Sequence, residues 1–178
     1  MAAGPFHPDI PMPSRTPFRL LALSLFAICT GLLAAGLYLQ HVQGIEPCPM
    51  CIMQRYALAV CGLIGLVAGL HNPRHGGQNG YAALLAVAAL AGGGVAARQS
   101  WIQWYPPAVS ECGPGLEYML ESFPLASSLP MIFRGAGDCS VVDWTFLHLT
   151  IANWSFLVFA AILGGLTAYL LRRKKSAF

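Results

Sequence analysis

The sequence predicts an all-α integral membrane protein, in which four transmembrane helices form a bundle and one long polar loop lies outside the membrane. Of its 178 residues, 56% are hydrophobic and only 10% are charged, whereas a soluble domain averages about 25% charged residues. The chain has room for about four spans of roughly 20 residues each. The net charge is only +3, and no basic patch is interleaved with aromatic residues, so we expect no nucleic-acid binding.

The N-terminal residues 1–17 are rich in proline, which excludes a regular element there, and we expect a flexible tail. The first span is expected at residues 20–39, a run without charge. It is too long for the apolar core of a typical cleaved signal peptide. Cys29 lies inside this span, where a thiol is most simply an inert packing residue.

Residues 46–55, with the sequence EPCPMCIMQR, precede and open the second span. Cys48 and Cys51 are close enough in the chain to form a small disulfide ring. Pro49 suits the first position of a helix, because its missing N–H has no partner there. Cys51 would then lie in the first turn, where the helix dipole favours a thiolate. Arg55 follows one turn later on the same face, which predicts a redox centre beside a cation.

The second span continues over residues 56–70 and contains Cys61, again expected to be inert. Residues 71–77 form a polar, turn-rich break. The third span is expected at residues 81–97. Its glycine run at 92–94 would let a neighbouring helix, or a flat ligand, approach the backbone.

Residues 98–150 form the one long polar segment. Within it, apolar residues recur with helical spacing over 116–123, which predicts a short amphipathic helix on the membrane surface. A loop collapsed on the helix ends is the alternative. The fourth span is expected at residues 151–171, followed by a basic cluster at 172–175.

The placement of charge predicts the orientation. Basic residues fall on one side of a four-span arrangement, at Arg15, Arg19, Arg74 and 172–175, and most acidic residues fall on the other. By the positive-inside rule both termini are cytoplasmic and both cysteine-bearing loops are periplasmic, where disulfides persist. We therefore expect a flexible cytoplasmic tail at 1–17, a four-helix membrane redox domain at 18–172 and a basic cytoplasmic tail at 173–178.

The cysteines divide into two in the middle of spans and four in the outer loops, namely Cys48, Cys51, Cys112 and Cys139. Four loop cysteines imply two disulfides, with three possible connectivities. A zinc site would also fit four thiolates, but the second pair lacks the usual close spacing, so we expect no metal. A purely structural role for both disulfides is not favoured either. A Cys48–Cys51 disulfide closes a loop of only two intervening residues, so it restricts the unfolded chain very little and adds little stability.

If the local Cys48–Cys51 ring forms, Cys112 and Cys139 are left to pair across the long loop. An outside dithiol could then reduce the outer pair, which could reduce the inner pair, which must in turn lose two electrons. The sequence shows no haem or iron–sulfur ligand set. We therefore expect a lipid-soluble quinone as the electron acceptor, near Arg55 and the third span.

Several motifs together resemble the bacterial disulfide bond formation protein B (DsbB) family. They are LQHV at 39–42, EPCPMCIMQR at 46–55, WYPP at 104–107, FRGAGDC at 133–139, WTFL at 144–147 and NWS at 153–155. The resemblance covers roughly residues 18–172. It implies an inner-membrane quinone reductase that reoxidises the periplasmic thiol oxidase DsbA and uses ubiquinone, or menaquinone when oxygen is scarce.

The resemblance also implies a role for each loop cysteine. The partner's thiolate would attack Cys112 and leave a mixed disulfide there. Cys139 would then engage Cys48 and release Cys51 as a thiolate beside the quinone, with Arg55 stabilising the charged species.

One position departs from the family pattern. Some members place a histidine near the quinone in the helix before the long loop, where this chain has Gln99. Glutamine can hydrogen-bond a quinone oxygen but carries no charge, and the neighbouring Arg98 could supply the missing cation. The alternatives are a paralogue with another thiol partner, a vitamin K epoxide reductase-like enzyme, or a non-enzymatic metal-binding membrane protein. An epoxide reductase would be expected to place its CxxC near the end of a late helix.

Overall fold

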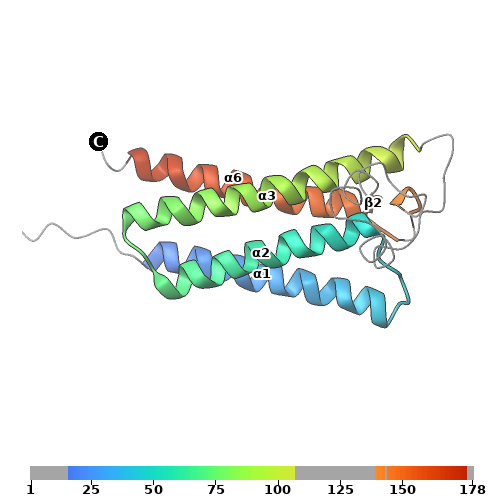
Figure 1. Cartoon of the computed structure of the whole chain (residues 1–178), viewed down its shortest axis with the longest axis horizontal. Coiled ribbons are helices and arrows are strands. Elements are labelled where there is room, and N and C mark those ends of the chain that lie inside the picture. The colour runs from blue at the N-terminus through green and yellow to red at the C-terminus, as the bar shows by residue number, and fades with distance from the viewer. Residues whose placement is uncertain (1–15, 107–138, 143, 176–178) are drawn as a thin grey trace, which may run out of the picture.

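A computed structural model describes residues 16–106, 139–142 and 144–175. Its described elements are α1 (Thr16–His41), α2 (Pro49–His71), α3 (His75–Trp104), β1 (Thr145–Phe146), β2 (Leu149–Thr150) and α6 (Ile151–Lys175) (Figure 1). The four helices are long and apolar enough to cross a membrane. The predicted four-helix membrane bundle is therefore confirmed. The amphipathic helix predicted at 116–123 lies outside the described residues.

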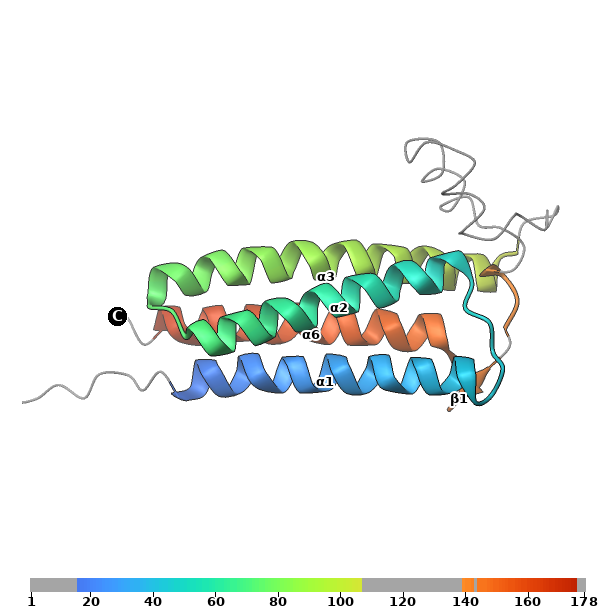
Figure 2. The same cartoon turned by 60° about the horizontal axis from the view of Figure 1, so that its bottom comes forward.

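The helices pack in chain order, with α1 against α2, α2 against α3 and α3 against α6 (Figure 2). The first of these contacts is close because α2 turns small residues toward α1. A Cβ on Gly65 would lie 2.8 Å from the carbonyl oxygen of Ala22, and one on Gly62 would lie 3.1 Å from the Cβ of Cys29. Small residues at such an interface let two backbones approach in a membrane.

The helices are longer than the sequence predicted, and the segments that connect them are correspondingly shorter. Helix α1 begins at Thr16, because Pro17 is tolerated in a first turn. The expected break at 71–77 shrinks to the three residues between α2 and α3, and Asn72 ends α2 in the left-handed conformation (φ 43°). Helix α3 continues to Trp104, so residues 98–104 are helical although their polar composition indicated a loop.

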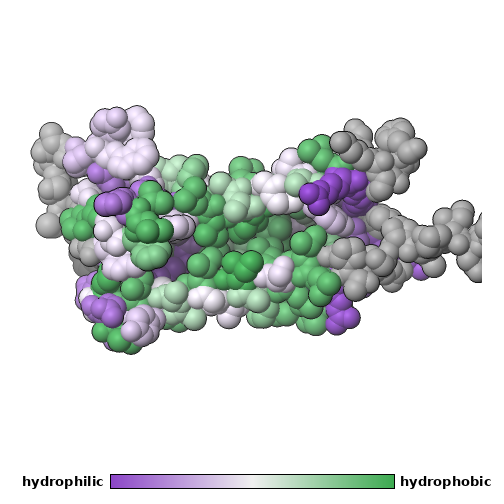
Figure 3. Space-filling view, turned by 180° about the vertical axis from the view of Figure 1, so that it is seen from behind, coloured by the Kyte–Doolittle hydropathy of each residue, from purple (hydrophilic) through white to green (hydrophobic). Residues whose placement is uncertain are grey.

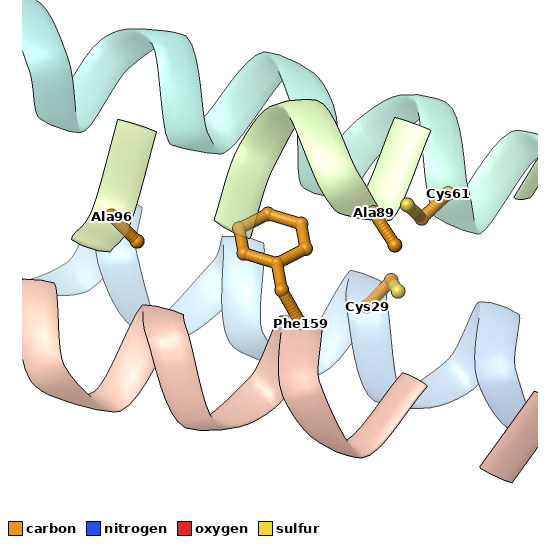
Figure 4. Packing of buried hydrophobic residues seen from close by; sticks show 5 residues of the cluster. All are labelled: Cys29, Cys61, Ala89, Ala96 and Phe159. Carbon is orange, nitrogen blue, oxygen red and sulfur yellow. The ribbon is translucent and has the colours of Figure 1, made fainter. Parts of the chain in front are cut away.

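The middle of the bundle is filled by a cluster of buried residues that includes Phe159, Ala89 and both mid-span cysteines (Figure 4). The ring of Phe159 lies on the backbone of Gly92, where an added Cβ would overlap it. The glycine run predicted to admit a neighbouring helix does so at this position. Cys29 and Cys61 are almost fully buried, as packing residues are.

The two ends of the bundle differ in chemistry. The start of α1, the end of α6 and the α2–α3 connection lie at one end, and the α1–α2 loop and the small sheet lie at the other (Figure 1). Hydrophobic residues cover the middle of the surface, and hydrophilic residues gather toward both ends (Figure 3). This distribution is that of a multi-pass membrane protein.

Candidate active site

The predicted helix start at Pro49 is confirmed, and it places both thiols of the CxxC motif at the beginning of α2. Cys48 is the N-cap residue, and its sulfur accepts a hydrogen bond of 3.4 Å from the backbone N–H of Cys51. The two Sγ atoms lie 3.0 Å apart, and both cysteines are free thiols. The first turn of α2 thus holds a dithiol poised to close into a ring.

Cys139 lies against this dithiol. It is 1% exposed and packs with Met50 and Ile102 in a buried cluster that Cys48 also contacts. The hydrogen bond of the Cys48 thiol to Cys139, a second to Cys51 and burial together raise the pKa of Cys48 well above its usual range. The structure therefore brings together three of the four loop cysteines. Cys112 lies outside the described residues, so its pairing stays a prediction.

Gln99 on α3 faces the same two sulfur atoms. Its amide Nε2 lies 3.3 Å from Cys48 Sγ and 3.2 Å from Cys51 Sγ, and the residue is only 2% exposed. Arg98, its neighbour in sequence, lies on the exposed side of α3. Of these two candidates, Gln99 is therefore the one whose side chain reaches the dithiol.

Gln54 also belongs to the site, although the sequence did not single it out. Its Nε2 donates a 2.7 Å hydrogen bond to Gln99 Oε1, and it is 4% exposed. Its own Oε1 is buried and has no partner among the described residues. Its position three residues after Cys51 places it near the thiol on α2, and that spacing was the available signal.

Arg55 holds α2 against α1. Its guanidinium donates hydrogen bonds to Gln40 Oε1 and, at 3.0 Å, to the carbonyl oxygen of Gly36. A Cβ on Gly36 would lie 3.4 Å from Arg55 Nε, in van der Waals contact, so the guanidinium packs directly over this glycine. The charge predicted beside Cys51 is thus present, and α1 helps to fix its position.

A cavity of about 330 Å³ opens between α1 and α6, and α2 and α3 line it with Cys51, Gln54, Arg55 and Gln99. The walls are mainly apolar, with Leu32 and Val158 among them, and Cys51, Arg55 and Gln99 line the same space. Seen from behind, the surface has a hollow toward the loop end with hydrophilic colour inside it (Figure 3). An apolar cleft with a few convergent polar groups is the usual form of a small-molecule site.

Residues 18–169 match the family model described as Disulfide bond formation protein DsbB. The chain belongs to the DsbB family. A disulfide bond formation protein B from Azoarcus sp. (strain BH72) is 71% identical over 143 residues, which are 80% of this chain and 86% of that protein. Relatives of the same name from Aromatoleum aromaticum and Polaromonas naphthalenivorans are 66% and 54% identical over 139 and 152 residues. They cover 78% and 85% of this chain, and 84% and 89% of their own lengths.

Membership of the DsbB family confirms the resemblance noted in the sequence and assigns the chain to disulfide bond formation as a disulfide oxidoreductase. The CxxC motif of this DsbB-family chain opens α2, and the epoxide reductase alternative is not favoured. The match does not assign a role to any single residue, so the roles of the cysteines, Arg55 and Gln99 are taken up as proposals below.

In this DsbB-family chain a small hairpin, which the sequence did not predict, contributes Phe146 and Thr150 to the lining of the cavity. Strands β1 and β2 are joined by Leu147 and His148, both with positive φ (50° and 62°), as a tight two-residue turn requires. Trp154 Nε1 donates to the carbonyl oxygen of Phe146 over 3.1 Å, and Thr150 Oγ1 donates to Gln103 on α3 over 2.7 Å. These bonds hold the segment after Cys139 against α3 and α6.

Proposed function

We propose that this DsbB-family protein is an inner-membrane thiol:quinone oxidoreductase, which reoxidises a periplasmic DsbA-like dithiol oxidase and passes the electrons to a membrane quinone. The observation that carries the proposal is the position of the Cys48–Cys51 dithiol at a cavity between α1 and α6. A reactive pair of thiols meets the apolar interior of the bundle there, next to a third thiol from the long loop.

The cavity fits the chemistry of a quinone head group, which is flat, largely apolar and carries carbonyl oxygens that only accept hydrogen bonds. Apolar side chains line most of the walls, while Arg55 and Gln99 carry N–H donors in the same space. The seam between α1 and α6 is not among the close helix contacts of the described bundle. This supports lateral entry of a lipid-soluble molecule from the bilayer. Ubiquinone and menaquinone share this chemistry, and either would serve.

The proposed relay begins at the outer pair. A thiolate of the partner attacks Cys112 of a Cys112–Cys139 disulfide, forms a mixed disulfide and releases Cys139 as a thiolate. The second partner thiol then displaces Cys112, and the partner leaves oxidised. Each step exchanges one disulfide for another, so no electrons are lost before the inner pair is reached.

The inner exchange uses the contact between Cys139 and Cys48. Cys139 attacks Cys48 of the closed ring, the Cys48–Cys51 bond breaks, and its electron pair stays on Cys51. The thiolate of Cys112 then attacks Cys139, which re-forms the outer disulfide and releases Cys48, so that Cys48 and Cys51 are left as the reduced pair. The reduced Cys48–Cys51 pair would close again into a disulfide by giving two electrons and two protons to a quinone held in the cavity beside Arg55 and Gln99. The net reaction converts one partner dithiol and one quinone into one disulfide and one quinol.

The proposed orientation follows the charges. Arg19, Arg74 and Arg172 lie at the end of the bundle opposite the cysteines, so the positive-inside rule supports cytoplasmic termini and periplasmic cysteine loops. The partner would then meet the long loop in the compartment where disulfides persist.

The experiment is oxidation of a purified, reduced DsbA-like partner by the protein in lipid nanodiscs, without oxygen and with or without added quinone. We expect loss of partner thiols that depends on quinone. Cys29→Ala, which changes a buried thiol that does not line the cavity, should behave as the wild type. Oxidation at the same rate without quinone would contradict the proposal.

Two further variants test the roles of the outer cysteines. Cys112→Ser should block acceptance of electrons from the partner, while the inner pair still reacts with quinone. Cys139→Ala should also block oxidation of the reduced partner, because Cys112 then has no disulfide bond for the partner's thiolate to attack. Full activity of Cys112→Ser would show that the outer pair is structural.

A further inference from the structure

Two buried glutamines, one on α2 and one on α3, are joined through their side-chain amides. Gln54 Nε2 donates to Gln99 Oε1 over 2.7 Å, and both residues are shielded from solvent. Because an amide has one donor end and one acceptor end, this bond decides which way Gln99 points. With its oxygen held by Gln54, the NH₂ group of Gln99 is turned toward the sulfur atoms of Cys48 and Cys51, at 3.3 and 3.2 Å.

The NH₂ group of Gln99 can therefore stabilise negative charge on either sulfur. The thiol of Cys51 also lies 3.7 Å from Gln99 Oε1, to which it can donate while it is protonated. Ionisation of the Cys51 thiol removes its S–H donor and leaves only the contacts from the Gln99 NH₂ group. These contacts become stronger, because hydrogen bonds to a charged acceptor are stronger than those to a neutral one.

The described hydrogen bonds of Arg55 point elsewhere, to Gln40 and Gly36 on α1. Besides Arg55, the titratable groups around Cys51 are Cys48, Cys139 and Glu46 of the loop that lines the same cavity. Helix α6 adds only uncharged side chains to that cavity. Among the described residues, the amide of Gln99 is thus the side-chain N–H donor within hydrogen-bond distance of the Cys48 and Cys51 sulfur atoms.

We propose that Gln54 is a positioning residue, which holds Gln99 in the orientation that stabilises the thiolate released on Cys51. The inference rests on the proposed relay. When the Cys139 thiolate bonds to Cys48, the Cys48–Cys51 bond breaks and Cys51 leaves with the electron pair, so the disulfide is exchanged without net oxidation. A better-stabilised leaving thiolate departs faster, and the Gln54–Gln99 pair therefore favours transfer toward the cavity.

The test measures alkylation of Cys51 in reduced, quinone-free protein by iodoacetamide across a range of pH, with each cysteine followed by peptide mass spectrometry. Gln54→Met keeps the length of the side chain but cannot donate. We expect it to slow Cys51 alkylation at neutral pH by about tenfold, since hydrogen bonds to charged groups are among the strong ones. Gln99→Met should have a similar effect, and the double variant should be no slower than either single one, because Gln54 acts through Gln99.

Gln54→Glu provides a sharper test of orientation. A carboxylate cannot donate to Gln99 Oε1 and would instead accept from the NH₂ group, which turns that group away from the sulfurs. We expect this variant to be slower than Gln54→Met at neutral pH. Alkylation as fast as in the wild type would overturn the assigned direction of the bond.

Gln78→Met is the matched control, because Gln78 is another buried glutamine with hydrogen-bonded amide atoms, at the opposite end of the bundle. It should leave Cys51 alkylation unchanged. The inference is overturned if Gln54→Met and Gln78→Met behave alike, or if the effects of Gln54→Met and Gln99→Met add. Since no quinone is present, failure of the wild type to reduce quinone would count against the proposed function and not against this pair.

Discussion

The thiol of Cys48 is hydrogen-bonded to Cys139, although the two residues come from loops that flank different helices. This contact sets the order in which the cysteines can exchange. Cys139 reaches the first cysteine of the CxxC ring, while Cys51 lies on the side of the cavity with Arg55. In the proposed relay, an electron pair that enters at Cys48 would therefore leave at Cys51.

The first prediction concerns connectivity. In a variant that keeps Cys48 and Cys139 but carries Cys51→Ser and Cys112→Ser, mild oxidation should join the two remaining loop cysteines rapidly. In the resting wild type we expect Cys48–Cys51 and Cys112–Cys139, with both mid-span cysteines free. Peptide mapping without reduction measures both states. A dominant bridge to Cys29 or Cys61 would contradict the topology as well as the relay.

The second prediction concerns the pH dependence of Cys48. Its hydrogen bond to Cys139, followed by that to Cys51, raises its pKa, so Cys48 stays protonated at neutral pH and should alkylate more slowly than an ordinary thiol. Removal of the acceptor in Cys139→Ala lowers that pKa, and the alkylation curve of Cys48 should move to lower pH. A curve that does not move would show that the two residues are not in contact in solution.

The third prediction concerns Arg55. Arg55→Ala should raise the KM for quinone by about tenfold, because a charged donor is lost from the cavity, and exchange at Cys112 should change little. Arg55→Lys keeps the charge but not the planar guanidinium, and should be partly active. The KM for quinone of each variant is measured by quinone titration of the purified proteins. Unchanged quinone kinetics in Arg55→Ala would leave this residue only as an anchor at the membrane interface.

Gly36 offers an independent way to move the same cation. A Cβ at Gly36 would already touch the guanidinium of Arg55, so a larger side chain there must displace it, whereas a Cβ at Gly31 on the same helix would meet nothing within 4 Å. Gly36→Leu should therefore weaken quinone use, and Gly31→Leu should not. Equal effects of the two substitutions would show that the response comes from the helix and not from Arg55.

The fourth prediction concerns packing. Gly92→Ala places a methyl group against the Phe159 ring and 2.8 Å from the Cβ of Ala57, and overpacking of this kind costs about 1–3 kcal/mol. Gly94→Ala meets nothing within 4 Å and is the control. Thermal unfolding in detergent, followed by tryptophan fluorescence, should show a lower Tm only for Gly92→Ala. A lower Tm for both would point to a loss of helix flexibility instead.

The sequence predicted the four spans and the helix start at Pro49 because apolar runs and proline chemistry are local signals. Composition placed residues 98–104 in the long polar segment after the third span, whereas the family resemblance placed Gln99 in the helix before the long loop; these residues are helical and carry Gln99 to the dithiol. The hairpin was missed because its two strands are only two residues long each. The role of Gln54 depends on a residue of another helix, which no pattern within 46–55 could reveal.

The most direct measurement of the central claim is the stoichiometry of quinone reduction during oxidation of a reduced DsbA-like partner, in nanodiscs without oxygen. Quinone absorbance and partner thiols are followed in the same sample. The account predicts one quinone reduced for each disulfide formed in the partner, and none in Cys51→Ser. Oxidation of the partner while the quinone absorbance stays constant would contradict it.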